Sequence, residues 1–220
     1  MTAGDSIVVI SPHSDDGVLS VGASMSAWAR EGRSVELLTV LALDPESGVP
    51  TSGWDRRAGF ATEGEAARAR RLEDGAACSM LGVTARWLPF GSVDFERHAT
   101  DDEVWQAARA AVEGASVVLL PGWPLSHPDH AWLSELLVRH LPADRIARYA
   151  EQPYASREEG VPYPASPVAA RDRVAKWRAV RAYRSQLPLL GMRNGLRRGP
   201  LRLALEPERI AWPDLYSQRS

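Results

Sequence analysis

Residues 6–22 read SIVVISPHSDDGVLSVG and change from strand-like to helix-like within a few positions. The run at 7–10 is apolar and β-branched, which is typical of a strand buried inside a parallel sheet. A helical pattern begins at residue 18 and continues to residue 30, where Glu31-Gly32 is a normal helix stop. A strand that passes almost directly into a helix indicates the start of a β-α-β unit.

The same alternation of strand-like and helix-like segments continues along most of the chain. Strands are expected at 6–11, 34–43, 85–90, 116–120 and 145–149, and helices at 18–30, 63–81, 101–112, 131–141 and 168–186. Such alternation predicts parallel strands joined by right-handed crossovers. We therefore expect an α/β fold, a three-layer sandwich with a mostly parallel, Rossmann-like sheet. A strand order beginning 3-2-1-4, as in doubly wound folds, would make the first and fourth strands neighbours.

The chain length of 220 residues fits a single domain over 1–220 with a substantial core. We expect that core to cover about 5–154, and a C-terminal extension, 155–220, to hold a helix and an extended tail. Residues 44–62 are rich in Gly, Pro and Ser and lack a clear period. Loops of this length in compact domains are usually functional or disordered.

Composition excludes several classes of protein. The hydrophobic and charged fractions, 45% and 25%, are typical of soluble globular proteins, and the net charge of −2 gives no general attraction to nucleic acid or to a membrane surface. No window approaches the ~20 apolar residues of a membrane helix, and the first residues lack the pattern of a signal peptide. Cys78 is the single cysteine, which rules out an internal disulfide and a multi-cysteine metal site. We therefore expect a cytoplasmic protein without a nucleic-acid or membrane partner.

Two polar loops stand out because each follows a predicted strand. Residues 13–16 read HSDD after the first strand, and residues 126–130 read SHPDH after the fourth. Open α/β sheets bind ligands outside the carboxyl ends of their strands, at the point where the strand order reverses. If the first and fourth strands are neighbours, three of the five histidines and three carboxylates converge in one crevice.

This mixture of imidazoles and carboxylates suits a divalent metal such as zinc. A catalytic zinc takes three protein ligands from His, Asp or Glu and keeps a position for water. His13 and Asp16 can both point inward where the strand turns into the helix, and His130 completes the set from the second loop. A bound cation also explains why the adjacent acids Asp15 and Asp16 are tolerated. We therefore predict a Zn²⁺ site formed by His13, Asp16 and His130.

The remaining polar residues of the two loops then acquire catalytic roles. Asp15 would accept a proton from the attacking water, whose pKa zinc lowers to about 7. His127 would stabilise an oxyanion or protonate a leaving amine, and Asp129 would set the tautomer and basicity of His127. The competing interpretation is structural, because a histidine at a strand end often only packs and an aspartate at a helix start often only caps it. Two such loops at neighbouring strand ends favour the metal site.

The motifs SPHSDDGVLSVGA at 11–23 and HPDH at 127–130 resemble those of the PIG-L/LmbE-like N-deacetylases. These are zinc-dependent hydrolases of N-acetylated amino sugars and their conjugates. Weaker landmarks agree in order and spacing, namely Arg70-x-x-Glu73 before LGV at 81–83, EQPY at 151–154 and AYRSQ at 182–186. The resemblance therefore runs from the first strand to about residue 190.

The resemblance implies the same metal ligands and the same general base, and it adds substrate contacts. Arg70 matches an arginine that contacts the sugar in relatives, and Asp94 lies where some relatives place a substrate-binding acid. Trp54 and Trp123 are candidates to stack on a sugar face, with a place in the core as the alternative for each. Gly17 replaces a frequent glutamate of the family, and the space it leaves at the helix start would then affect substrate shape.

The predicted function is hydrolytic removal of an N-acetyl group from an amino sugar within a small molecule or glycoconjugate, such as a secondary metabolite. One alternative is an amidase that cleaves a larger amide of a sugar–thiol conjugate. Another is a non-enzymatic ligand-binding α/β domain, which is disfavoured because no Gly-x-Gly-x-x-Gly sequence follows the first strand. The basic segment 168–202 is interpreted as a solvated helix face, with contact to a phosphate-bearing substrate as the alternative.

Overall fold

The computed structural model describes residues 5–93, 96–157, 159–190 and 199–213. The strands of its main sheet are β1 (Ser6–Ser11), β2 (Ser34–Thr39), β3 (Thr84–Trp87), β6 (Val117–Trp123), β7 (Ile146–Ala150) and β8 (Ile210–Ala211). Their order across the sheet is β3-β2-β1-β6-β7-β8. The first five of these pair in parallel, and β8 pairs antiparallel with β7. The expected strand order and the mostly parallel sheet are confirmed.

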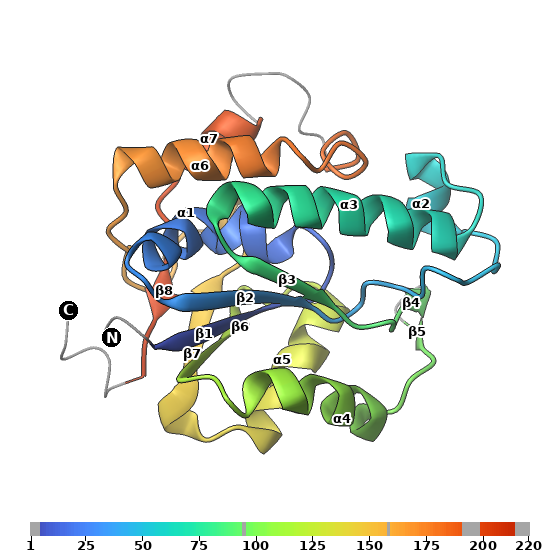
Figure 1. The fold of residues 1–220 in the computed structure, drawn as a ribbon, viewed down its shortest axis with the longest axis horizontal. Coiled ribbons are helices and arrows are strands. Elements are labelled where there is room, and N and C mark those ends of the chain that lie inside the picture. Colours follow the sequence, from blue (N-terminus) through green and yellow to red (C-terminus); the bar gives the residue numbers. More distant parts are fainter. Residues whose placement is uncertain (1–4, 94–95, 158, 191–198, 214–220) are drawn as a thin grey trace.

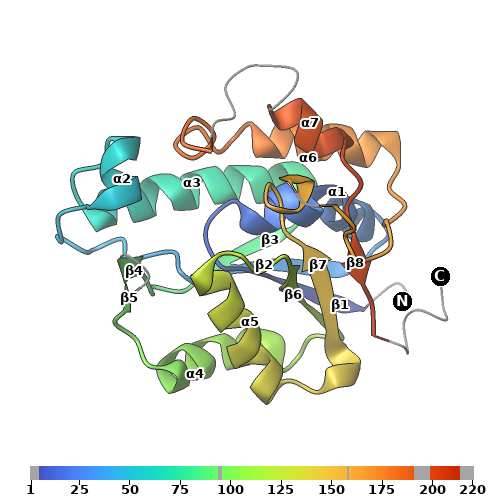
Figure 2. The same ribbon diagram turned by 180° about the vertical axis from the view of Figure 1, so that it is seen from behind.

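Two layers of helices cover this sheet. The helices are α1 (Asp16–Arg30), α2 (Gly53–Ala58), α3 (Glu63–Leu81), α4 (Asp101–Val112), α5 (Pro128–His140), α6 (Ala170–Val180) and α7 (Pro200–Leu205), with short 3-10 turns at Ala143–Arg145 and Ala155–Arg157. Figures 1 and 2 show α1, α3, α6 and α7 on one side of the sheet and α4 and α5 on the other. A hairpin of β4 (Ser92–Val93) and β5 (Glu96–Arg97) completes the fold. The predicted three-layer sandwich is confirmed.

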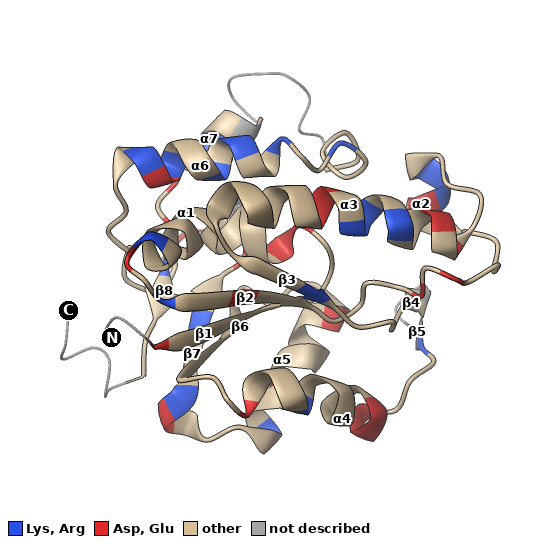
Figure 3. Cartoon of the chain, in the orientation of Figure 1, with Lys and Arg blue, Asp and Glu red and all other residues tan. Residues whose placement is uncertain are grey.

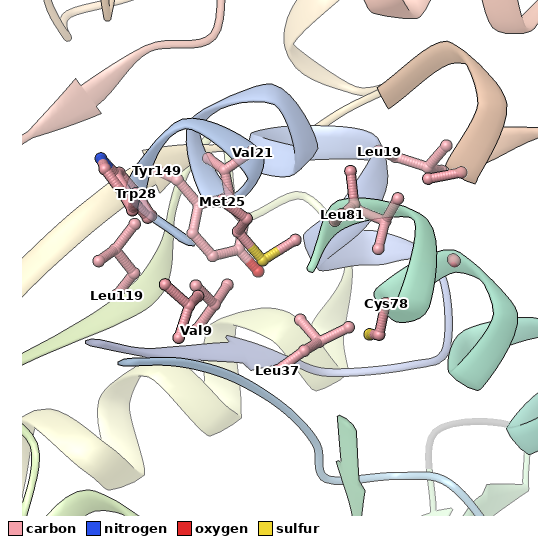
Figure 4. Packing of buried hydrophobic residues seen from close by; sticks show 14 of the residues in the cluster. Val9, Leu19, Val21, Met25, Trp28, Leu37, Cys78, Leu81, Leu119 and Tyr149 are labelled. Atoms are coloured by element: carbon pink, nitrogen blue, oxygen red, sulfur yellow. The ribbon is translucent and has the colours of Figure 1, made fainter. Parts of the chain in front are cut away.

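The side chains of β1 alternate between two hydrophobic clusters, one on each face of the sheet. Ile7 and Val9 belong to the cluster shared with α1, α3 and α6, whereas Val8 and Ile10 pack with α4 and α5. Figure 4 shows Val9 of the sheet beneath Met25 of α1. A strand buried on both faces needs apolar residues at successive positions, which explains the continuous apolar run in β1.

Three helices differ in extent from their expected ranges. α5 begins at Pro128, three residues earlier than expected, because His127 caps the helix and proline suits its first position. α1 likewise begins at Asp16, inside the first polar loop. The helix expected over 168–186 is α6, which ends at Val180 and is followed by turns. Residues of both functional motifs therefore lie in the first turns of helices.

The C-terminal extension is more regular than the extended tail that the sequence suggested. It contains α7 and β8, and Ile210 of β8 is buried and pairs with Tyr149 of β7. Covering an edge strand in this way removes unpaired main-chain groups from the sheet edge. The loop at 44–62 also has structure of its own, because it contains α2. Among the described helices, none is long and apolar enough to cross a bilayer. The division of a single domain, 1–220, into a core over about 5–154 and an extension over 155–220 stays a prediction.

The basic C-terminal segment corrects one expectation. Its lysine, Lys176, is 1% exposed and forms an ion pair with the equally buried Glu208 (2.7 Å), so it does not belong to a solvated face. Glu208 also accepts hydrogen bonds from the amides of Ala23 (2.8 Å) and Ser24 (2.7 Å), next to Val21, where α1 departs from helical geometry. The pair therefore ties the extension to α1. Figure 3 shows the three other basic residues of α6, of which Arg171 and Arg178 are exposed as expected and Arg173 is half-buried.

Candidate active site

The carboxyl ends of β1 and β6 bring the two sequence motifs together. His13 follows β1, Asp16 begins α1, and His130 lies in the first turn of α5. Asp16 Oδ2 lies 3.3 Å from His13 Nδ1 and 3.1 Å from His130 Nε2. The two histidine nitrogens are 3.2 Å apart, so the three atoms form a nearly equilateral triangle.

This triangle has the dimensions of three ligands on one metal ion. Ligands about 2.0–2.1 Å from a tetrahedral ion lie roughly 3.3 Å from one another. The remaining nitrogen of each histidine faces a carboxylate, since His13 Nε2 lies 3.3 Å from Asp129 Oδ2 and His130 Nδ1 contacts Glu151 Oε1. Carboxylates in such positions orient metal-binding histidines and raise their basicity. The residues present therefore fit a divalent metal, and zinc is a suitable ion.

His127 stands next to this triangle and provides a second possible ligand set. One ligand atom from each of His13, His127 and His130 lies within 4.8 Å of the others. However, His127 caps α5, and its Nδ1 accepts a hydrogen bond from the main-chain amide of Asp129 (3.3 Å). Asp16 lies within 3.3 Å of both other histidines, which favours Asp16 over His127 as the third ligand.

Burial and mutual contact shift the titration of the metal-free cluster. Burial by itself opposes ionisation of Asp16, but His130 and His13 hold the pKa of its carboxyl far below the usual range. Burial also disfavours the charged form of His130, yet Asp16 and Glu151 raise its pKa to about 10. Burial, with His13 and His130 nearby, lowers the pKa of His127 to about 4, so this imidazole is neutral near pH 7. Without a metal, the cluster therefore holds a proton that a cation would displace.

Asp15 lies directly before the helix that carries Asp16. Its side chain lines a cavity beside the cluster, and the residue is 6% exposed. It adopts a φ of +97°, which residues other than glycine take rarely. Burial, together with the charge of Asp16, raises the pKa of Asp15 well above its usual value. A carboxylate of raised pKa is the stronger base, as proton transfer near neutral pH requires.

Gly17 has a different consequence from the one expected. A Cβ at this position would lie 2.5 Å from Leu37 Cδ1, so the glycine allows α1 to pack closely against β2. The space it leaves is therefore taken by the protein core, and the expected effect on substrate shape is wrong.

The cavity beside the cluster has a volume of about 450 Å³. Apolar and aromatic side chains form part of its lining, namely Leu41, Leu43, Trp54, Tyr154 and Leu190. Arg70 also lines the cavity and forms an ion pair with Asp55 of α2. Trp54 is anchored by a hydrogen bond from its Nε1 to Gln186 Oε1 (2.9 Å). The loop at 44–62 and the turn after α6 therefore meet at the cavity.

The other two expected substrate contacts are placed differently. Trp123 ends β6 and is not among the described residues that line the cavity. Asp94 lies outside the described residues. Substrate contacts by these two residues stay predictions.

The carboxylate of Asp129 has a different main partner from the one expected. It contacts His13, accepts a hydrogen bond from Ser92 Oγ (2.6 Å) and pairs with Arg97 Nη1 (2.8 Å). The hydrogen bond between Asp129 and His127 uses the main-chain amide of Asp129. Burial opposes its ionisation, but the contacts with His13 and Ser92 hold the pKa of Asp129 below its usual range. Asp129 is thus placed to orient His13.

Sequence reasoning missed three residues that support the cluster, Glu151, Ser92 and Arg97. Glu151 directly follows β7, the neighbour of β6, so a carboxylate at the end of a third adjacent strand is the signal that could have found it. Ser92 and Arg97 lie in the β4–β5 hairpin, whose strands are too short to leave a periodic pattern. Both residues contact Asp129.

Comparisons with known proteins agree with this geometry. The profile of the PIG-L family, described as GlcNAc-PI de-N-acetylase, matches residues 8–141, more than half of the chain. No curated protein matches the sequence. A triple mutant (Orf2*T) of a deacetylase involved in the teicoplanin biosynthetic pathway has 26% identity and a TM-score of 0.74, over 95% of this chain and 99% of that one. The A40926 pseudoaglycone deacetylase Dbv21 has 26% identity and a TM-score of 0.71, over 94% and 96%.

A third solved structure, the zinc-inhibited form of teicoplanin deacetylase Orf2, shares the fold at 24% identity and a TM-score of 0.72, over 93% of this chain and 96% of that one. PIG-L/LmbE deacetylases are metal-dependent, and this chain gathers both family motifs around one histidine-rich cluster. These findings support an enzyme rather than a non-enzymatic ligand-binding domain. The chain belongs to the PIG-L family of de-N-acetylases and is a metal-dependent N-deacetylase.

Proposed function

We propose that this N-deacetylase uses zinc to remove the N-acetyl group of an amino sugar carried by a small molecule or glycoconjugate of secondary metabolism. The triangle of His13, Asp16 and His130 beside the cavity is the observation that carries the proposal. Two similar structures are a deacetylase of teicoplanin biosynthesis and the A40926 pseudoaglycone deacetylase, which supports a glycopeptide as the carrier of the sugar. The cytoplasmic location expected from the sequence stays a prediction.

His13, Asp16 and His130 would hold the zinc, while Asp129 and Glu151 keep the two imidazoles oriented. When bound, zinc supplies a Lewis acid for the amide carbonyl and lowers the pKa of water. Asp15 would take the proton of the attacking water, because burial and the neighbouring Asp16 raise its pKa. Water then adds to the carbonyl carbon, and the C–N bond breaks once the amine receives a proton.

His127 would supply a hydrogen bond to the oxyanion. Its Nδ1 accepts a hydrogen bond from the Asp129 amide, so we assign the ring proton to Nε2. A neutral imidazole in this tautomer can donate to an oxygen that gains charge during the reaction. Since His127 then has no second proton to give, we assign protonation of the leaving amine to Asp15, which has taken a proton from water.

The cavity offers both polar and aromatic surface to a sugar conjugate. Arg70 is held by Asp55, which leaves its guanidinium fixed at the cavity wall. Trp54 is fixed by Gln186 and can stack on a sugar ring or on an aromatic group of the carrier. We therefore propose Arg70 and Trp54 as substrate contacts.

The test uses the purified chain, depleted of metal and reloaded with zinc. N-acetylglucosamine, simple N-acetyl glycosides, nucleotide sugars and an N-acetylglucosaminyl glycopeptide pseudoaglycone are supplied separately, and acetate and free amine are quantified. We expect zinc-dependent release of acetate, fastest from the glycopeptide. Reloaded protein that releases no acetate from any of these substrates would contradict the proposal. Product mass distinguishes loss of acetyl from cleavage of a larger amide.

A further inference from the structure

Two sequence motifs outside the metal cluster contact each other in the folded chain. Glu73 belongs to the motif Arg70-x-x-Glu73 in α3, and Ser185 belongs to AYRSQ at 182–186, in the turns after α6. Glu73 Oε1 accepts a hydrogen bond from the Ser185 amide (2.9 Å), and Glu73 Oε2 accepts one from Ser185 Oγ (2.7 Å). Gln186, which lines the cavity, donates from Nε2 to Ser185 Oγ (2.8 Å). The two motifs therefore form one hydrogen-bonded unit at the cavity.

This unit determines which end of the Gln186 side chain faces Trp54. The Ser185 hydroxyl donates its proton to Glu73, so it can only accept a hydrogen bond from Gln186, and the amide nitrogen of Gln186 must face it. Gln186 Oε1 is then available to Trp54 Nε1, which can only donate, and the two atoms lie 2.9 Å apart. Gln186 is 5% exposed, so both ends of its amide need partners inside the protein. The orientation of Gln186 therefore follows from its neighbours.

Trp54 lies in a helix that the hydrophobic core does not hold. None of the six residues of α2 is buried, and a helix of this length is not stable by itself. Figure 1 shows α2 beyond one end of α3, at the edge of the molecule. Trp54 attaches α2 to Gln186, and Asp55 attaches it to Arg70 of α3. The position of the Trp54 ring therefore depends on polar contacts rather than on core packing.

Trp54 and the metal cluster meet different parts of a bound substrate. Asp16 is 8% exposed, whereas Trp54 is half-buried in a helix on the outside of the protein, and both line the same cavity. The acetamide has to reach the buried cluster to react. The part of the substrate that meets Trp54 is therefore remote from the acetamide, on the side of the molecule that carries the sugar.

We propose that Gln186 is a positioning residue that holds Trp54 at the outer wall of the cavity and thereby sets the affinity for the carrier of the sugar. This inference rests on the proposed function, in which Trp54 contacts the substrate. A ring that is already fixed loses little freedom when a substrate binds, whereas a mobile ring has to be ordered, which weakens binding. Glu73 and Ser185 hold Gln186 in the orientation that Trp54 requires.

The variant Gln186→Met keeps an unbranched side chain of similar length but removes the oxygen that accepts from Trp54. With the N-acetylglucosaminyl glycopeptide pseudoaglycone as substrate, we expect KM to rise about 3- to 10-fold, the effect of ordering one large side chain. We expect kcat to stay within about twofold, because the metal ligands and Asp15 are unchanged. Gln106→Met is the matched control, since Gln106 is exposed on α4, across the sheet from α2, and it should leave KM unchanged. An unchanged KM in Gln186→Met, or a loss confined to kcat, would overturn the proposal.

A double-mutant cycle with Trp54→Phe tests whether Gln186 acts through Trp54. Phenylalanine keeps an aromatic ring but has no N–H group to donate to Gln186. We expect Trp54→Phe to raise KM, and we expect Gln186→Met to cause no further rise in that background, because the contact is already lost. Equal effects of Gln186→Met in both backgrounds would show that Gln186 contacts the substrate directly, contrary to the proposal.

Hydrogen exchange of the Trp54 indole N–H, followed by NMR, is a readout that needs no substrate. The resonance is identified by its absence in Trp54→Phe. We expect slow exchange in the wild type and in Gln106→Met, and exchange at least about tenfold faster in Gln186→Met. Exchange in the wild type as fast as in free tryptophan would refute the proposal even if Gln186→Met failed to fold. If the zinc-loaded protein deacetylates no substrate, the proposed function fails, whereas the exchange measurement still decides whether Gln186 holds Trp54.

Discussion

His13 Nδ1 and His130 Nε2 lie 3.2 Å apart, although 117 positions separate the two residues in the chain. The other nitrogen of each ring faces a carboxylate, Asp129 for His13 and Glu151 for His130. Once the cluster has lost the proton that it holds without a metal, each ring keeps its proton on the outer nitrogen, and the inner nitrogens both present lone pairs toward Asp16 Oδ2. Three lone pairs that converge repel one another, and a cation among them removes the repulsion.

Loss of one ligand should abolish metal binding. In His130→Ala we expect zinc to fall from about one ion per chain to near zero, because two ligands remain where catalytic sites use three. Elemental analysis after dialysis measures this. His140 is the control, since it stacks on Trp105 and is not in the cluster, and His140→Ala should keep its zinc. Equal zinc content in His130→Ala and the wild type would show that His130 is not a ligand.

Asp15→Asn should separate metal binding from catalysis. The amide keeps the size of the side chain but cannot take a proton from water. We expect wild-type zinc content and a turnover about 10²- to 10⁴-fold lower, the usual contribution of a general base. Steady-state acetate release and elemental analysis of the same preparation measure the two effects. Wild-type activity in a zinc-loaded Asp15→Asn sample would refute the role of Asp15.

Glu151→Gln should weaken metal binding, because Glu151 contacts the outer nitrogen of the ligand His130. The glutamine can still accept a hydrogen bond from His130 but no longer raises the basicity of its imidazole. We expect zinc affinity to fall by about 10- to 100-fold, measured by competition with a chromophoric chelator. Glu113→Gln is the control, because Glu113 pairs with Arg109 on the surface. Equal affinities in the two variants would argue against a supporting role for Glu151.

Zinc binding should release protons near neutral pH. In the metal-free chain, Asp16 and Glu151 raise the pKa of His130 to about 10, so its imidazole is protonated at pH 7–9 and must lose a proton before it binds metal. Affinity should therefore rise with pH, by about tenfold per unit for each proton released. Titration calorimetry in buffers of different ionisation enthalpy counts these protons. A count of zero at pH 7.5 would contradict the expected protonation of His130.

The buried ion pair of the C-terminal extension should matter for stability. Lys176→Met removes the cation that pairs with Glu208 inside the protein. We expect the free energy of unfolding to fall by about 3–5 kcal/mol, measured by chemical denaturation. Arg109→Met breaks an exposed pair instead and should cost less than about 1 kcal/mol. Similar losses in the two variants would show that the buried Lys176 pair contributes no more to the free energy of unfolding than an exposed pair does.

Local patterns predicted the regular elements well where caps mark the ends. Thr62 and Gly82 bound α3, Thr100 caps α4, and both helices have the expected ranges. A cap acts within one helical turn and is therefore visible in the sequence. The same reasoning misplaced the start of α5, because His127 and Pro128 were interpreted as loop residues although they cap and open the helix.

The members of the candidate cluster were also visible in the sequence, since ligand chemistry depends on residue type and on position at strand ends. The orientation of their side chains was not visible in the sequence. Glu151 and Arg97 support the site from elements that are distant from its motifs in the sequence and adjacent to them in the folded chain. The Asp129 carboxylate contacts His13 because the folded sheet places His13 across the crevice from Asp129. The local sequence around Asp129 does not contain this information. Periodicity and capping act over a few residues, whereas the partner of a buried carboxylate depends on how the whole chain packs.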